Sequence, residues 1–259
     1  MYPELFRIGD FSVSTFGVMM AIAFLVGGEL AARSFERAGE RREIAWQLVT
    51  WCAIGGILGA KLWYVVEQAA RNSGVPWTEF LLSRSGLTWY GGFAGGTIAG
   101  LLGGRHYGVR LSRLVDLAAP TLAAGQAIGR IGCLLVGDDY GRPSDLPWAI
   151  SFPNGLPPTI DEAGHVFSVH PTMVYETLWL GAATLWLWRR RGRSPFLFGE
   201  YLFLAGTGRL WIELLRTNPP ALGPLTNAQL VASLCLAIGL AEWLRRRVQR
   251  PGVSPGAAA

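Results

Sequence analysis

The sequence has little cysteine, little histidine and little charge. Its 259 residues include three cysteines and three histidines, and only 16% of the residues are charged. The cysteines (Cys52, Cys133 and Cys235) all fall within long apolar segments and give neither a disulfide framework nor a metal-ligand spacing. We therefore expect neither a metal site nor a cofactor.

Long apolar segments are what the chain has instead. Hydrophobic residues make up 51% of it, and glycine and tryptophan are plentiful at 34 and 11. Seven segments are long and apolar enough to cross a membrane at about 20 residues each: 13–32, 46–66, 87–104, 114–136, 173–190, 199–215 and 227–244. They predict an all-α, polytopic membrane protein that forms one domain over residues 1–259. We expect the tail 251–259 to be disordered.

Positive charge is concentrated in alternate connections between these segments. The basic connections hold Arg33, Arg37, Arg41 and Arg42, then Arg105, Arg110 and Arg113, then Arg189, Arg190, Arg191 and Arg193, then Arg245, Arg246, Arg247 and Arg250. Because such charge stays cytoplasmic, the N-terminus is predicted outside and the C-terminus inside. These arginine clusters are thus orientation signals first, and contact with anionic lipid is a second use. The net charge of +5 therefore requires no nucleic-acid partner.

Two arginines lie inside predicted spans, where a charge is costly. Arg130 and Arg209 are each about six residues from the outer end of their segment, which places them roughly 9 Å deep. An intramembrane arginine is by default a functional group that faces a polar interior. Since arginine suits bidentate recognition of phosphate, the predicted ligand is the headgroup of an outer-leaflet phospholipid.

Other polar residues fall in the same outer half of the membrane: Lys61, Tyr90, Glu176 and Glu213. Glu213 follows Arg209 by four residues, on the same helix face. Beside Arg130, Gly129 and Gly132 would leave room for a ligand. Simpler interpretations remain open, because Lys61 can snorkel to the interface and Arg209 with Glu213 can be a structural ion pair.

The longest connection, 137–172, is predicted to be an external loop. It is acidic, and long loops beside a site often act as lids or binding surfaces. The alternation at Trp148, Ile150 and Phe152 predicts a short strand within it. Its acids are Asp138, Asp139, Asp145, Asp161 and Glu162.

Five blocks of sequence carry a family resemblance: Trp89-Tyr-Gly-Gly-Phe-Ala-Gly-Gly96, Gly129-Arg-Ile-Gly-Cys-Leu-Leu-Val-Gly-Asp-Asp-Tyr-Gly-Arg142, His170-Pro-Thr-Met-Val-Tyr-Glu176, Gly206-Thr-Gly-Arg-Leu-Trp-Ile-Glu-Leu-Leu-Arg216 and Leu225-Thr-Asn-Ala-Gln-Leu230. In this order they resemble the bacterial prolipoprotein diacylglyceryl transferases. The resemblance implies transfer of the diacylglyceryl group of phosphatidylglycerol to the lipobox cysteine of a prolipoprotein signal peptide, with loss of glycerol phosphate. It also implies a multi-pass protein of the bacterial inner membrane.

The resemblance further implies roles for individual residues. Arg130 and Arg209 would hold the lipid phosphate and stabilise the charge of the leaving group, and Tyr90 stands where the family places its proposed base. A second set would line the substrate site by orienting the arginines or shaping its edge: Glu176, Glu213, Gly141, Arg142, Gly91, Gly92, Cys133 and Asp138.

The chain departs from the family at four polar positions, which are Phe16, Tyr90, Cys133 and Ala205, where Tyr, His, Asn and Tyr are usual. The phosphate half of the site is intact by motif, whereas the acceptor half is altered. The acceptor thiol can lose its proton to Tyr90 as a phenolate beside an arginine, to His170, or through the field of the arginines alone. Cys133 is either a small buried residue or a reactive thiol. Two alternative functions follow: a related transferase with another acceptor, and a non-catalytic phospholipid-binding protein.

Overall fold

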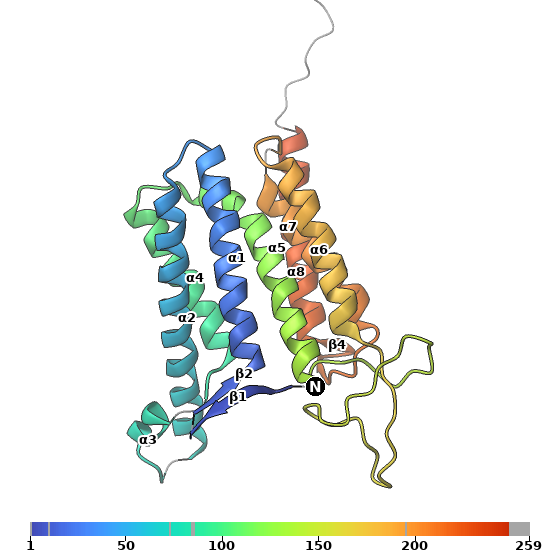
Figure 1. Ribbon diagram of the computed structural model, residues 1–259. Helices are drawn as coiled ribbons and strands as arrows, with labels where there is room; N and C mark the ends of the chain where they lie inside the picture. The colour runs from blue at the N-terminus through green and yellow to red at the C-terminus, as the bar shows by residue number, and fades with distance from the viewer. Residues whose placement is uncertain (1, 10, 73, 84–85, 195, 249–259) are drawn as a thin grey trace, which may run out of the picture. The chain divides into compact units, whose positions relative to one another are not determined.

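The structure, a computed structural model, describes residues 2–9, 11–72, 74–83, 86–194 and 196–248. Helices dominate this part of the chain (Figure 1). Those that coincide with the seven predicted segments are α1 (Thr15–Arg37), α2 (Arg42–Arg71), α4 (Trp89–His106), α5 (Leu111–Val136), α6 (Thr172–Arg190), α7 (Leu197–Glu213) and α8 (Asn227–Val248). The short helix α3 (Trp77–Leu82) was not predicted. The predicted disordered tail, 251–259, lies outside the described residues.

Two small antiparallel hairpins correct the all-α prediction. Strands β1 (Glu4–Ile8) and β2 (Phe11–Ser14) precede α1, and β3 (Pro220–Leu222) and β4 (Leu225–Thr226) precede α8. The first predicted segment, near 13–32, therefore starts within β2. The helix begins at Thr15, because the Ser14 hydroxyl accepts the N–H of Gly17 at 3.1 Å and caps the first turn. At the predicted strand in the external loop, an isolated bridge pairs Ile150 with Val169.

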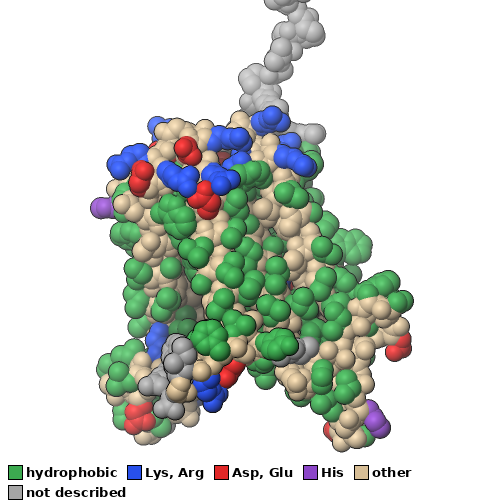
Figure 2. Space-filling view, viewed as in Figure 1, with side chains coloured by type: hydrophobic (Ala, Val, Ile, Leu, Met, Phe, Trp, Pro, Cys, Tyr) green, Lys and Arg blue, Asp and Glu red, His purple; other side chains and the backbone are tan. Residues whose placement is uncertain are grey.

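Within the described part of the chain, four helices are long and apolar enough to cross a membrane: Thr15–Arg37, Arg42–Arg71, Leu111–Val136 and the Asn227–Arg245 part of α8. Their outer faces are apolar, as on α2, where Ile57 and Leu62 are 62% and 59% exposed. Figure 2 shows hydrophobic side chains along the flanks of the helices, with Lys and Arg gathered at helix ends. Apolar surface this extensive marks a membrane contact, and the chain is a multi-pass membrane protein.

The described chain forms two compact units. The α2–α4 unit comprises residues 24–118, and the α5–α8 unit comprises residues 1–23 and 119–259. Each has its own apolar core. That residues 1–259 form a single transmembrane domain stays a prediction.

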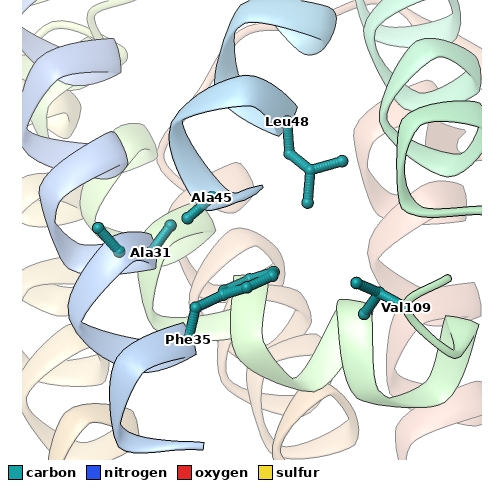
Figure 3. Packing of buried hydrophobic residues seen from close by; sticks show 6 residues of the cluster. Ala31, Phe35, Ala45, Leu48 and Val109 are labelled. Carbon is teal, nitrogen blue, oxygen red and sulfur yellow. The ribbon is translucent and has the colours of Figure 1, made fainter. Parts of the chain in front are cut away.

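Glycines bring α2 and α4 together within the α2–α4 unit (Figure 1). A Cβ added at Gly59 would lie 2.3 Å from the carbonyl oxygen of Gly91, and one added at Gly95 would lie 2.3 Å from that of Gly55. Only residues without a side chain allow so close a backbone approach, as is common between membrane helices. The basic end of this unit packs around Phe35, which is 2% exposed and contacts Ala31, Ala45, Leu48 and Val109 (Figure 3).

Helix α7 packs against both α6 and α8 in the α5–α8 unit. Its core contains Ala119, Ala123, Leu187, Leu197 and Tyr201, and the Tyr201 hydroxyl accepts a hydrogen bond from Gln126 Nε2 at 2.6 Å. Helix α8 begins with a capping box: Thr226 Oγ1 accepts the N–H of Gln229, whose side chain accepts the N–H of Thr226. These contacts fix the helices that carry the predicted arginines.

Candidate active site

The end of α5 determines where Asp138 and Asp139, the acidic residues of the block Gly129–Arg142, lie. Gly137, at φ +79°, donates its N–H to Cys133 O at 2.8 Å, and the N–H of Asp138 reaches the same oxygen at 3.1 Å. A glycine in the left-handed region ends helices in this way, because other residues adopt it only at a steric cost. The chain then turns sharply, with Asp139 at φ +60°. Asp138 and Asp139 are thereby placed close to Arg130 on the preceding turns.

A single buried carboxylate joins the two predicted arginines. Glu176, on α6, forms an ion pair with Nε of Arg130 through one oxygen and accepts a hydrogen bond from NH1 of Arg209 at 2.6 Å through the other. The Glu176 side chain is 6% exposed, whereas those of Arg130 and Arg209 are 24% and 23% exposed. The family resemblance implied that Glu176 would help to orient the arginines or shape the edge of the site, and Glu176 pairs with both arginines. The two guanidiniums are thus fixed and remain accessible.

Glu213 is the second anchor of the site. Its side chain is fully buried, and its Oε2 lies 2.8 Å from NH2 of Arg209, so the ion pair that the sequence analysis left open is present. The other oxygen, Oε1, accepts hydrogen bonds from Asn218 at 2.8 Å and Thr226 at 2.6 Å. Burying a carboxylate is costly unless it is paired and hydrogen-bonded, and here both conditions are met. Thr226 therefore caps α8 and holds Glu213 at once.

Arg216 and Asp139 were missed as site residues by the sequence analysis. Asp139 accepts a hydrogen bond from Arg130 NH1 at 2.6 Å through Oδ2, and another from Arg216 NH2 at 2.6 Å through Oδ1. Arg216 is 8% exposed, and its Nε lies 3.9 Å from Glu213. Sequence spacing offered one signal, since Arg216 follows Glu213 by three residues. The site is therefore a network of three arginines and three carboxylates.

The two aspartates after α5 have different electrostatic surroundings. Burial raises the pKa of Asp138, and its Oδ1 is buried without a hydrogen-bond partner among the described residues. Burial would also raise the pKa of Asp139, but Arg216 and Arg130 outweigh it and hold this pKa below its ordinary value. Ligand atoms of Cys133, Asp138 and Asp139 lie within 4.8 Å of one another. The guanidiniums paired with Asp139 repel a cation at this point.

Gly141 and Arg142 hold the external loop against the ends of α6 and α7. The N–H of Gly141 donates to His170 O at 2.9 Å, and that of Arg142 donates to Leu215 O at 2.8 Å. A Cβ at Gly141 would lie 2.6 Å from Leu215 O, so a larger residue would displace the loop. Of the two glycines beside Arg130, Gly129 faces open space, whereas Gly132 packs against Phe16 and Met19.

The remaining predicted site residues belong to the α2–α4 unit. Tyr90, in the first turn of α4, is 61% exposed and makes an edge-on contact with Trp89. Gly91 is buried against the backbone of Gly59, which explains why this position is small, and a Cβ added at Gly92 would have its nearest neighbours at 3.5 Å. Lys61 donates hydrogen bonds to Ser83 at 2.7 and 3.0 Å. A place for Tyr90, Gly91 and Gly92 beside the arginines stays a prediction.

Comparison with known proteins identifies the family of this chain. The sequence profile of the prolipoprotein diacylglyceryl transferases matches residues 3–245. The chain belongs to this family. The phosphatidylglycerol–prolipoprotein diacylglyceryl transferase of Gloeobacter violaceus is 35% identical over 256 residues, which cover 96% of this chain and 94% of the relative. Proteins of the same name from Nostoc sp. and Synechococcus elongatus are each 34% identical, over 98% and 92% of this chain and 94% and 85% of their own.

Cys133 lies in the last turn of α5 of this transferase. It is 8% exposed, and its sulfur is 3.9 Å from NH1 of Arg130. Arg130 has much closer partners in Asp139 and Glu176. The position therefore fits a small buried residue, which is how a free cysteine commonly behaves.

Replacing Cys133 by alanine is accordingly expected to leave turnover of phosphatidylglycerol within about threefold of the parent, since a small hydrophobe is exchanged for another. Release of glycerol phosphate by the purified variant measures this. Cys235→Ala, a similar change in α8, is the matched control. A loss much larger than in the control would make Cys133 a reacting or hydrogen-bonding group.

Proposed function

We propose that Arg130 and Arg209 bind the phosphate of phosphatidylglycerol while its diacylglyceryl group passes to the cysteine thiol of a prolipoprotein. The observation that supports this most is the buried bridge of Glu176 between the two guanidiniums. The relatives are named as transferases that act on phosphatidylglycerol and prolipoprotein. With the family, they make the chain a prolipoprotein diacylglyceryl transferase.

The reaction needs cations that are in place before it begins. The thiolate sulfur attacks the glyceryl carbon that carries the phosphate ester, a C–S bond forms, and the C–O bond breaks. The electron pair leaves with glycerol phosphate, so negative charge grows on the phosphate. Donors that are fixed beforehand stabilise such charge most effectively. Glu176 and Glu213 supply this fixation, because both are buried and each holds Arg209 from a different side.

Tyr90, as a phenolate, is our candidate for accepting the thiol proton, since only the thiolate is an effective nucleophile. Its exposed side chain, at the start of α4, is open to a substrate. Tyr90→Phe removes the hydroxyl and keeps the ring, and should lower kcat by about 10²-fold or more, as expected for loss of a general base. The KM for phosphatidylglycerol should change little.

Steady-state kinetics at several pH values, with a lipobox peptide as acceptor, measures this effect. Trp89→Phe, at the neighbouring position, controls for replacement of one aromatic side chain by another at the start of α4. Full activity of Tyr90→Phe would remove Tyr90 as the base, and the field of the arginines on the acceptor thiol would then take its place.

We further propose seven membrane crossings in the bacterial inner membrane, with the N-terminus outside and the C-terminus cytoplasmic. Helices α4, α6 and α7 would add three spans to the four that satisfy the length and hydropathy requirements. The arginine clusters at alternate connections support this orientation. It would place Glu176 and both arginines in the outer half of the bilayer, where an outer-leaflet headgroup can reach them.

Mass spectrometry of a lipobox peptide tests the proposed function. The purified protein is incubated with the peptide and phosphatidylglycerol, and release of glycerol phosphate is measured in the same tube. We expect the cysteine to gain one diacylglyceryl group, with an equal amount of glycerol phosphate released. Glycerol phosphate without a modified peptide would indicate another acceptor. Lipid binding with neither product would indicate a binding protein.

A further inference from the structure

Asp139 differs from the other two carboxylates of the arginine network. Its side chain is 43% exposed, whereas those of Glu176 and Glu213 are 6% and 0% exposed. Glu176 and Glu213 project from helices, but Asp139 lies in the loop that follows α5. It is therefore the carboxylate that a substrate can displace most easily.

The backbone of Asp139 is held independently of its side chain. Its carbonyl oxygen accepts hydrogen bonds from Thr172 Oγ1 at 2.7 Å and from Arg216 NH1 at 2.6 Å. Rotation about χ1 can therefore withdraw the carboxylate while the loop stays in place. Its φ of +60° also suits the residue type, because aspartate and asparagine tolerate this region better than most residues.

Every arginine of the network is already paired with a carboxylate without any substrate. Arg130 pairs with Asp139 and Glu176, Arg209 pairs with Glu176 and Glu213, and Arg216 pairs with Asp139. The pKa of Asp139 lies below its ordinary value, so its carboxylate is ionised near neutral pH. A phosphodiester added to this network would bring in an uncompensated negative charge. Binding is therefore favoured if one carboxylate leaves.

We propose that Asp139 is a built-in counter-ion that occupies the phosphate position between Arg130 and Arg216 and is exchanged for the lipid phosphate when phosphatidylglycerol binds. This inference rests on the proposed function and adds Arg216 to the groups that contact phosphate. The Asp139 carboxylate presents two oxygens sharing one negative charge, one to each guanidinium. A phosphodiester also presents two oxygens sharing one negative charge, so it can replace the carboxylate at both arginines.

The same exchange assists the release of product. Glycerol phosphate is a monoester, which carries nearly two negative charges near neutral pH, and a network of three arginines binds it more tightly than the diester. Return of the Asp139 carboxylate to Arg130 and Arg216 supplies a competing anion. Asp139 thus weakens the binding of substrate and product alike, and it keeps the product from blocking the site.

Asp139→Asn tests this inference, because it removes the charge and keeps the size and the backbone preference. We expect the KM for phosphatidylglycerol to fall about five- to tenfold, since the binding-competent state no longer competes with an internal anion. Inhibition by glycerol phosphate should tighten by a similar factor, and kcat should not rise. Kinetics with the lipobox peptide, with and without added glycerol phosphate, gives all three values.

Two further variants make the result decisive. Glu162→Gln removes an exposed negative charge from the same loop and should leave KM and product inhibition unchanged. Asp139→Gly, which also tolerates a positive φ, replaces the asparagine variant if that variant does not fold. Unchanged or weaker binding of both lipid and glycerol phosphate in a folded variant would overturn the inference and leave Asp139 a structural tie.

The proposed function can fail separately. If the parent protein released no glycerol phosphate from phosphatidylglycerol, the proposed reaction would be wrong. Calorimetric titration with glycerol phosphate would still compare Asp139→Asn with the parent. Tighter binding in the variant supports the internal counter-ion, and equal or weaker binding contradicts it.

Discussion

Arg130→Ala is expected to reduce the turnover of phosphatidylglycerol by about 10³-fold, the upper range for removing one donor to a developing anion. The guanidinium lies in the last turns of α5 and contacts Asp139 and Glu176, so its loss removes a charge and the partner of a buried carboxylate. Arg130→Lys should recover only part of the activity, because an ammonium group cannot make paired contacts in one plane. Release of glycerol phosphate measures both variants.

Arg193→Ala is the control for the change in net charge, since Arg193 lies in the basic turn after α6 and outside the network. It should retain the parent turnover. Circular dichroism and thermal unfolding in detergent establish that each variant is folded. Full turnover by a folded Arg130→Ala variant would remove the arginine network from the mechanism.

Glu176→Gln is expected to lower kcat by about 10²-fold, because both guanidiniums lose the group that sets their positions. It should also lower the free energy of unfolding by about 3 kcal/mol, the lower end for removing one partner of a buried ion pair. The reason is the same in each case: a carboxylate that is 6% exposed pairs with Arg130 and Arg209 at once. Kinetics and denaturant unfolding in detergent measure the two effects.

Glu200→Gln provides a matched control, because Glu200 also joins α6 to α7. It pairs with Arg190 at 2.7 Å, but this pair is more exposed, with side chains 22% and 42% accessible. Glu200 binds Arg190 through both carboxylate oxygens and also accepts hydrogen bonds from Trp186 and Ser194, so its loss should lower stability as well, but turnover should not change. If Glu176→Gln behaved like Glu200→Gln, the bridge would have no special role in positioning the arginines.

Local spacing made part of the network predictable from the sequence. Arg209 and Glu213 are four residues apart on one helix, and their ion pair follows from helix geometry alone. The segments around them are apolar over many residues, which is why the helices were predicted with only their ends in error. The first helix begins late because Ser14 caps it and the residues before it pair as a hairpin.

Contacts between segments that are far apart in the chain could not be predicted from the sequence. The double role of Glu176 depends on how α5, α6 and α7 pack, and no local pattern encodes that packing. Arg216 resembled an ordinary external cation because it lies past the end of α7. Asp139 resembled one acid among several in a loop, and only the turn at Gly137 aims it at two arginines.

A structure of the protein with phosphatidylglycerol bound, in the absence of an acceptor peptide, tests the central claim most directly. We predict phosphate oxygens within about 3 Å of guanidinium nitrogens of both Arg130 and Arg209, with Glu176 still between them. A phosphate oxygen that also contacts Arg216, with the Asp139 carboxylate displaced from Arg130 and Arg216, would support the counter-ion exchange as well. A headgroup bound elsewhere, with every ion pair of the network intact, would contradict the assignment of this site to phosphate.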